Sequence, residues 1–164
     1  MKELPVREQI RLQDYNYSSA GYYFITICVK DRHELLGKVV GDAHLGVPLL
    51  ELTEIGEEVK RYVDNISSTY NNVKIDKYTI MPNHIHLIVI IKDGTPRCAS
   101  PTKSVLAKVI NAFKSLTSRK FGESMWQRSY HDHIIRGEAE YQRIWQYIDE
   151  NPMNWQEDCY FVKD

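Results

Sequence analysis

The sequence has few cysteines and no long hydrophobic run. Its three cysteines, Cys28, Cys98 and Cys159, form no Cys-x-x-Cys pair. This spacing argues against a zinc ribbon, and the odd number fits a reducing compartment. No apolar run has the length of a membrane span, and the N-terminus lacks the hydrophobic core of a signal peptide. We therefore expect a cytoplasmic protein with no membrane partner.

Acidic side chains are absent from residues 97–122, although the whole chain is nearly neutral, with 21 basic and 22 acidic residues. A local basic face on a neutral protein is typical of a surface that binds a polyanion. It is equally typical of a solvated helix face, so composition leaves both interpretations open. The basic residues of this stretch are Arg97, Lys103, Lys108, Lys114, Arg119 and Lys120.

The chain has 164 residues, of which 43% are hydrophobic, which is enough for one globular domain with a real core. We therefore expect a single domain over residues 1–164. The polar residues 1–20 predict an irregular N-terminal arm. Residues 156–164 form a C-terminal tail that could cover the sheet, pair at its edge or regulate the site.

Hydrophobic periodicity predicts an α+β protein. We expect strands over residues 22–29, 73–81, 84–91 and 126–135, and a low-regularity hairpin within residues 35–52. Helices are expected over residues 54–67, with Thr53 as N-cap, over 102–120 and over 138–150. The core order βαββαβ is the ferredoxin-like pattern, an antiparallel sheet with two helices on one face, and a further helix follows it. In this pattern the strands at 73–81 and 84–91 form a hairpin.

Two histidines lie inside the apolar run 84–91. Alternate residues of a strand share a face, so His84 and His86 point the same way and Ile85 and Leu87 point the other way. Two neutral imidazoles side by side on a rigid strand form half of a metal site. The alternative is a pair of core histidines that are packed or bonded to carboxylates.

The last predicted helix carries a tyrosine and an asparagine on one face. Tyr147 and Asn151 are four residues apart, which places them one above the other. This spacing could hold a hydroxyl group beside a metal that the amide helps to bind. The alternative is an interfacial tyrosine and a C-terminal capping asparagine. Both residues are expected to lie off the apolar stripe formed by Tyr141, Ile144, Trp145 and Ile148.

These motifs carry a resemblance to a known family. The segment 81–87, Met-Pro-Asn-His-Ile-His-Leu, fits the His-hydrophobe-His (HUH) signature and resembles its form in single-tyrosine transposases of the insertion-sequence-200-like superfamily. The segment 130–136 (Tyr-His-Asp-His-Ile-Ile-Arg) and the Tyr-Ile-x-x-Asn-Pro of residues 147–152 look like the branch called REP-associated tyrosine transposases. Residues 22–26 and 113–115 also look like that branch, so the resemblance runs from about residue 21 to residue 155.

The resemblance implies a metal-dependent transposase or endonuclease acting on single-stranded DNA. His84, His86 and Asn151 would ligate Mg²⁺ or Mn²⁺, and Tyr147 would be the nucleophile. The enzyme would cleave and rejoin DNA at palindromic hairpin repeats, through a 5′-phosphotyrosine intermediate with a free 3′-hydroxyl. Its partners would be single-stranded DNA hairpins, and the protein would be a monomer or a homodimer. The fold expected from the family agrees with the βαββαβ order.

Several other residues are candidates for the same site. His131 and His133 form a second His-x-His, which could be another metal pair but is better explained by residues that support the metal ligands or contact DNA. Tyr130 and Tyr141 are competing nucleophiles, but Tyr141 falls on the apolar stripe and Tyr130 has Ile134 instead of an amide four residues later, so both are better explained as structural. Alternative functions are a catalytically silent hairpin-binding protein and a metal-dependent hydrolase that uses water. The expected DNA contacts are Lys103, Lys108, Lys114, Arg119, Lys120, Arg128 and Arg136.

Overall fold

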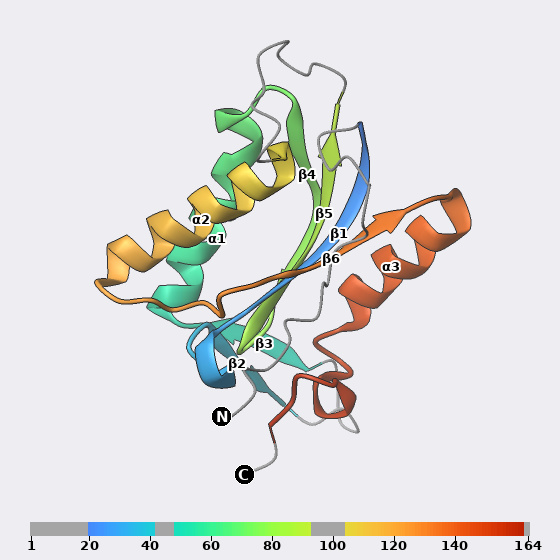
Figure 1. Ribbon diagram of the computed structural model, residues 1–164. Coiled ribbons are helices and arrows are strands. Elements are labelled where there is room, and N and C mark those ends of the chain that lie inside the picture. Colours follow the sequence, from blue (N-terminus) through green and yellow to red (C-terminus); the bar gives the residue numbers. More distant parts are fainter. Residues whose placement is uncertain (1–19, 42–47, 93–103, 163–164) are drawn as a thin grey trace, which may run out of the picture.

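A computed structural model describes residues 20–41, 48–92 and 104–162. Its centre is a four-stranded antiparallel sheet in the order β4-β5-β1-β6 (Figure 1). The strands are β1 (Gly21–Cys28), β4 (Val73–Ile80), β5 (His84–Ile91) and β6 (His131–Ile135). A separate hairpin pairs β2 (Gly37–Val40) with β3 (Leu49–Leu52). The predicted α+β class is confirmed, and so is the β4–β5 hairpin. Strand β5 lies between β4 and β1, which shields it as predicted.

Two helices cover one face of the sheet, α1 (Glu54–Thr69) and α2 (Val105–Phe121) (Figure 1). Thr53 caps α1 as predicted, because its hydroxyl oxygen accepts from the Gly56 N–H at 3.1 Å. The odd-numbered residues of β5 face these helices and join the main core. Its buried members include Ile85, Leu87, Val89 and Ile91 from β5, Val59 and Val63 from α1, and Leu106, Ile110 and Phe113 from α2.

The third helix, α3 (Glu138–Glu150), lies on the opposite face of the sheet (Figure 1). A second, smaller core joins it to the sheet, where buried Ile148 packs with Ile88 of β5 and Ile135 of β6. The even-numbered residues of β5, and therefore both histidines, face this side. The fold thus separates a hydrophobic layer under α1 and α2 from a layer under α3 that contains polar side chains.

A β-bulge in β4 fixes the position of α3. The pairing of β4 with β5 shifts between Ile75 and Lys77, so Asp76 and Lys77 both reach the α3 side instead of alternating. The Tyr141 hydroxyl donates to Asp76 Oδ2, and Lys77 Nζ pairs with Asp149 on α3. Both ends of the helix are therefore anchored to two adjacent residues of one edge strand.

Two predicted elements differ from the structure. The strand expected over residues 126–135 is shorter, because β6 spans His131–Ile135 and Trp126 forms only an isolated bridge with Val29. The backbone carbonyls of residues 127–129 accept from Lys114 Nζ instead of from a neighbouring strand. Helix α1 runs to Thr69 rather than to residue 67. The predicted arm up to residue 19 lies outside the described residues, as do the loop at 93–103 and residues 163–164.

Candidate active site

The two histidines of β5 meet at a single point. His84 Nε2 and His86 Nε2 are 3.0 Å apart, and the residues are 0% and 1% exposed. His84 Nδ1 donates to the amide oxygen of Asn83 at 2.8 Å, which leaves a lone pair on its Nε2. His86 Nδ1 lies 2.8 Å from the hydroxyl of Thr26, the residue opposite it on β1. These partners orient both rings so that their Nε2 atoms face the same spot.

Burial keeps both imidazoles neutral. Desolvation lowers the pKa of His84 to about 3, with a further contribution from the Arg32 guanidinium. Desolvation and the neighbouring His84 also hold the pKa of His86 well below its usual value. A histidine must be neutral to donate a lone pair to a cation. The pair is therefore in the protonation state that metal ligation requires.

Helix α3 brings the predicted tyrosine and asparagine to these rings. The Tyr147 hydroxyl oxygen is 3.4 Å from His86 Nε2, and the side chain of Phe24 packs edge-to-face against its ring. Tyr147 as a whole is 41% exposed, in agreement with its expected place off the apolar stripe. Burial of its hydroxyl and the nearby Asp158 carboxylate raise the pKa of Tyr147. The structure therefore holds this residue as a protonated phenol.

Asn151 is 2% exposed and lies under the sheet side of α3, so it is more deeply buried than we expected. It keeps helical dihedral angles (φ −56°, ψ −41°) although Pro152 follows it, a position where helical geometry is disfavoured. This conformation carries the helical phase on to Asn151. Its Oδ1 is buried and has no hydrogen-bond partner in the described part of the chain.

The exposure of Trp145 differs from the prediction. It was expected on the apolar stripe of α3, but it is 37% exposed. Its ring lies 3.7 Å from Lys77 Nζ, a cation–π contact at the edge of the sheet. The buried side of α3 therefore centres on Ile148, with Tyr141 and Ile144 partly buried beside it.

The C-terminal segment, residues 155–162, adds groups that the sequence did not single out. Its Asp158 side chain is 1% exposed, and Asp158 Oδ2 lies 4.0 Å from His84 Nε2 and 3.5 Å from the Tyr147 hydroxyl. The Tyr160 ring packs on His84 with centroids 4.5 Å apart. Residues 155–157 form a single 3-10 turn, η2 (Trp155–Glu157). A short irregular segment has no periodicity, so only its contacts show that it belongs to the site.

These side chains fit a divalent cation. One reactive atom each from His84, His86 and Asp158 lies within 4.8 Å of the others. Ligand atoms about 2.1 Å from one Mg²⁺ lie roughly 3 Å apart when adjacent and about 4.2 Å apart when opposite. The 3.0 Å and 4.0 Å separations at His84 fall in that range. The unpartnered carbonyl oxygen of Asn151 is a further oxygen donor of the kind such ions bind.

The competing candidates are engaged elsewhere. Tyr130 is buried in the main core, and hydrogen bonding to Asp76 raises the pKa of Tyr141 to about 12. His133 Nε2 donates to Glu140 Oε1 at 2.7 Å, while His131 is exposed. His131 lies opposite Thr26, which places it on the same face of the sheet as His86.

The predicted basic residues divide into two groups. Lys108, Arg119 and Lys120 are exposed on α2, which covers the face of the sheet opposite the histidine pair (Figure 1). Arg128 and Arg136 are exposed and flank β6. Lys114 instead donates to three backbone carbonyls and is half-buried. Lys103 lies outside the described residues.

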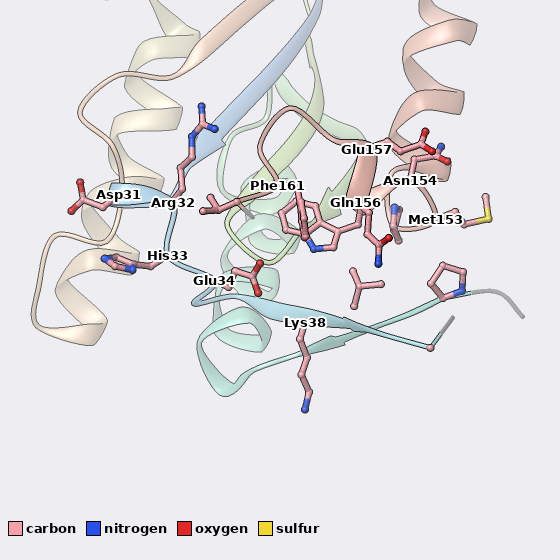
Figure 2. A pocket seen from close by; sticks show the side chains of 16 residues that line it. Asp31, Arg32, His33, Glu34, Lys38, Met153, Asn154, Gln156, Glu157 and Phe161 are labelled. Atoms are coloured by element: carbon pink, nitrogen blue, oxygen red, sulfur yellow. The ribbon is translucent and has the colours of Figure 1, made fainter. Parts of the chain in front are cut away.

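A cavity of about 850 Å³ adjoins the C-terminal segment. It lies between that segment and the stretch from Asp31 to Val39, and Figure 2 shows Phe161 and Gln156 on one side with Glu34 on the other. Asp31 and Arg32 line it and adopt left-handed backbone conformations, with φ of 56° and 57°. The buried Trp155 lines this cavity, and its ring centroid lies 5.9 Å from that of His84.

The helices of the described residues include none with the length and apolar character needed to cross a membrane.

Comparison with known proteins places this arrangement in a family. An uncharacterized protein of Haemophilus influenzae strain Rd is 37% identical over 174 residues, covering 95% of this chain and 93% of that protein. A solved structure of a REP-associated tyrosine transposase bound to a REP hairpin has a TM-score of 0.64 and 18% identity, covering 88% of this chain and 73% of that one. That likeness shows a shared fold. The profile of the family described as "Transposase IS200 like" matches residues 17–151. The chain therefore belongs to the IS200-like transposase family.

Proposed function

We propose that this transposase cleaves and rejoins single-stranded DNA at palindromic hairpin repeats, with Tyr147 as nucleophile and a divalent cation, Mg²⁺ or Mn²⁺, held by His84, His86 and Asn151. One observation carries the proposal. The Tyr147 hydroxyl lies 3.4 Å from His86 Nε2, and the unpartnered carbonyl oxygen of Asn151 follows one helical turn later. A nucleophile and three ligand groups thus converge from β5 and α3.

In this proposal each residue has a defined task. His84 and His86 supply neutral nitrogen ligands whose orientation is fixed by Asn83 and Thr26. Asn151 supplies a carbonyl oxygen from the end of α3. When bound, the cation polarises the scissile phosphate and neutralises charge that develops on its oxygens. Tyr147 attacks the phosphorus, which forms the O–P bond of a 5′-phosphotyrosine, breaks the bond to the 3′ oxygen and leaves a free 3′-hydroxyl.

The environment of Tyr147 explains why the cation is needed. Burial and the Asp158 carboxylate favour the neutral phenol, which is a poor nucleophile. A cation held by the two histidines would oppose both effects. The residue is therefore unreactive until the ion and the phosphate are both in place, which limits attack on other electrophiles.

The basic residues have different proposed roles because they lie on different faces. We propose that Arg128 and Arg136, beside β6, contact phosphates near the cut. Lys108, Arg119 and Lys120 on α2 would contact phosphates of a hairpin stem that extends around the sheet. Lys103, which lies outside the described residues, is a further proposed phosphate contact. Lys114 could join them only by giving up carbonyl bonds that it makes within the protein.

The test is a denaturing gel with labelled single-stranded DNA that contains imperfect palindromes from the genomic flanks of the gene. With Mn²⁺ or Mg²⁺ the unmodified protein should give a slow covalent band and a shortened free strand. Tyr147→Phe should lose the band entirely while binding DNA within about twofold. His84→Ala should lose both cleavage and adduct.

Tyr78→Phe is the matched control, since it removes a tyrosine hydroxyl that is bonded to Asp64 on α1 and does not hold α3. It should keep the covalent band. An adduct that persists in Tyr147→Phe would overturn the assignment of the nucleophile. Cleavage without any adduct would indicate a hydrolase that uses water, and hairpin binding without cleavage would indicate a silent binding protein.

A further inference from the structure

We infer that Asp158 is an additional protein ligand of the cation, so that the C-terminal segment completes the metal site. This inference rests on the proposed function, because it concerns the same ion. It assigns a role to a residue eleven positions beyond the nucleophile, in a segment outside the family match at 17–151. The ligand set would then come from three parts of the fold: β5, the end of α3 and the C-terminal segment.

A buried carboxylate faces the histidine pair. The Asp158 side chain is 1% exposed, and in the part of the chain that the structure describes its ion-pair contact is with His84, at 4.0 Å. Its shortest hydrogen bonds come from the Asn151 amide and the Tyr160 backbone N–H, which are neutral groups and bring no net positive charge. A buried carboxylate is strongly destabilising unless a cation or several hydrogen bonds compensate it. A divalent ion at the histidine pair would supply the missing positive charge.

The side chains of Asp158 and Asn151 are in direct contact. Asp158 Oδ2 now accepts from the Asn151 Nδ2–H at 2.8 Å, while Asn151 Oδ1 has no hydrogen-bond partner among the described residues. A half-turn of the Asn151 amide would bring its oxygen beside Asp158 Oδ2. Two oxygens held that close repel each other unless both bind a cation. With the amide turned in this way, the site would present a pair of oxygen donors, beside two nitrogen donors, to one bound ion.

Backbone hydrogen bonds fix the Asp158 side chain in place. The Tyr160 N–H donates to Asp158 Oδ1 at 2.7 Å, which leaves Oδ2 directed at the histidines. The Tyr160 carbonyl accepts from Asn83 Nδ2 at 2.8 Å, and Asn83 is the residue that orients His84. Arg32 Nη1 donates to the Cys159 carbonyl at 3.1 Å. One network thus positions the carboxylate and the first histidine ligand together.

The experiment is Mn²⁺ binding to the full-length protein by isothermal titration calorimetry, without DNA. Asp158→Asn keeps the shape of the side chain and should weaken Mn²⁺ binding about 10- to 100-fold, as loss of a metal-site partner commonly does. Glu157→Gln is the matched control, because it removes the adjacent, exposed carboxylate. It should bind Mn²⁺ within about twofold of the unmodified protein.

Two further variants separate a folding defect, failure of the proposed metal site and failure of the role proposed for Asp158. Asp158→Glu keeps the charge on a longer side chain and should bind Mn²⁺ more tightly than Asp158→Asn, which guards against a general folding defect. Unchanged or tighter binding by Asp158→Asn would overturn the inference and make Asp158 a cap over an empty histidine pair. If His84→Ala also binds Mn²⁺ like the unmodified protein, the proposed metal site itself fails. If only His84→Ala loses binding, the proposed function stands and the role of Asp158 does not.

Discussion

Two buried histidines are the residues from which the pH behaviour of this protein follows. In the folded chain His84 and His86 are held neutral by desolvation, and the pKa of His84 falls to about 3. In the unfolded chain both return to about 6.5. Between these values the unfolded state binds more protons than the native state. Acid therefore favours unfolding in that window.

We predict that the free energy of unfolding of the metal-free protein falls by about 2 kcal/mol or more between roughly pH 7 and pH 4.5. The stability is present above the unfolded-state pKa and is lost as the pH drops toward the folded-state value. Urea denaturation followed by tryptophan fluorescence at a series of pH values in EDTA would measure this slope.

The histidine contribution is isolated by His84→Gln, which keeps a polar side chain but cannot be protonated. This variant should show a shallower decline over the same pH range. An identical slope in the variant would assign the acid sensitivity to carboxylates elsewhere in the chain.

At the scale of elements, the position of α3 decides whether Tyr147 reaches the histidines. The bulge in β4 turns Asp76 and Lys77 toward α3, where they bond Tyr141 and Asp149. Lys77 also lies under the Trp145 ring. Few apolar side chains join this helix to the sheet, so these polar contacts fix its angle and its height.

We predict that Lys77→Met lowers stability by about 1 kcal/mol, in the range of a partly exposed ion pair with a cation–π contact. The rate of covalent adduct formation should fall by a larger factor, because Tyr147 then moves relative to His86. Thermal unfolding and single-turnover cleavage would measure the two effects. Lys60→Met removes an exposed ion pair with Asp64 on α1 and should leave the cleavage rate unchanged. Equal small effects of both variants would contradict a positioning role for Lys77.

The elements that can be predicted from the sequence are those in which hydrophobic residues recur at a regular spacing. The helices and the four sheet strands follow from apolar spacing, and Thr53 follows from capping chemistry. The bulge at Asp76 and the late start of β6 depend on long-range partners, namely α3 and Lys114, and no local pattern reveals them. Asp158 could not be predicted from the sequence for the same reason, because one carboxylate in an irregular segment is distinguished only by the residues it contacts.

The whole molecule presents basic side chains on two sides of the sheet. Lys108 and Arg119 on α2 are separated from the histidine pair by the sheet itself, whereas Arg128 and Arg136 flank β6. A DNA hairpin that contacts both groups must pass around the molecule. A single compact strand would contact only the second group.

We predict that the double variant Lys108→Ala/Arg119→Ala weakens hairpin binding and lowers the slope of log affinity against log salt by about 1 to 2, since each lost phosphate contact lowers the slope by roughly 0.7 to 0.9. Cleavage at saturating DNA should stay at the unmodified rate. Fluorescence anisotropy over a salt series would measure the slope. A slope equal to that of the unmodified protein would show that this side of α2 is only a solvated face.

The order of the site along the chain has a consequence for protein synthesis. The last strand ends at Ile135, and Tyr147, Asn151 and Asp158 all come later. A ribosome that has released the sheet from its exit tunnel has still not released the side chains proposed to cut DNA. A nascent chain beside its own gene, or a product truncated before residue 147, would carry the histidine pair without Tyr147. The proposed strand cleavage therefore requires that translation has passed Asp158.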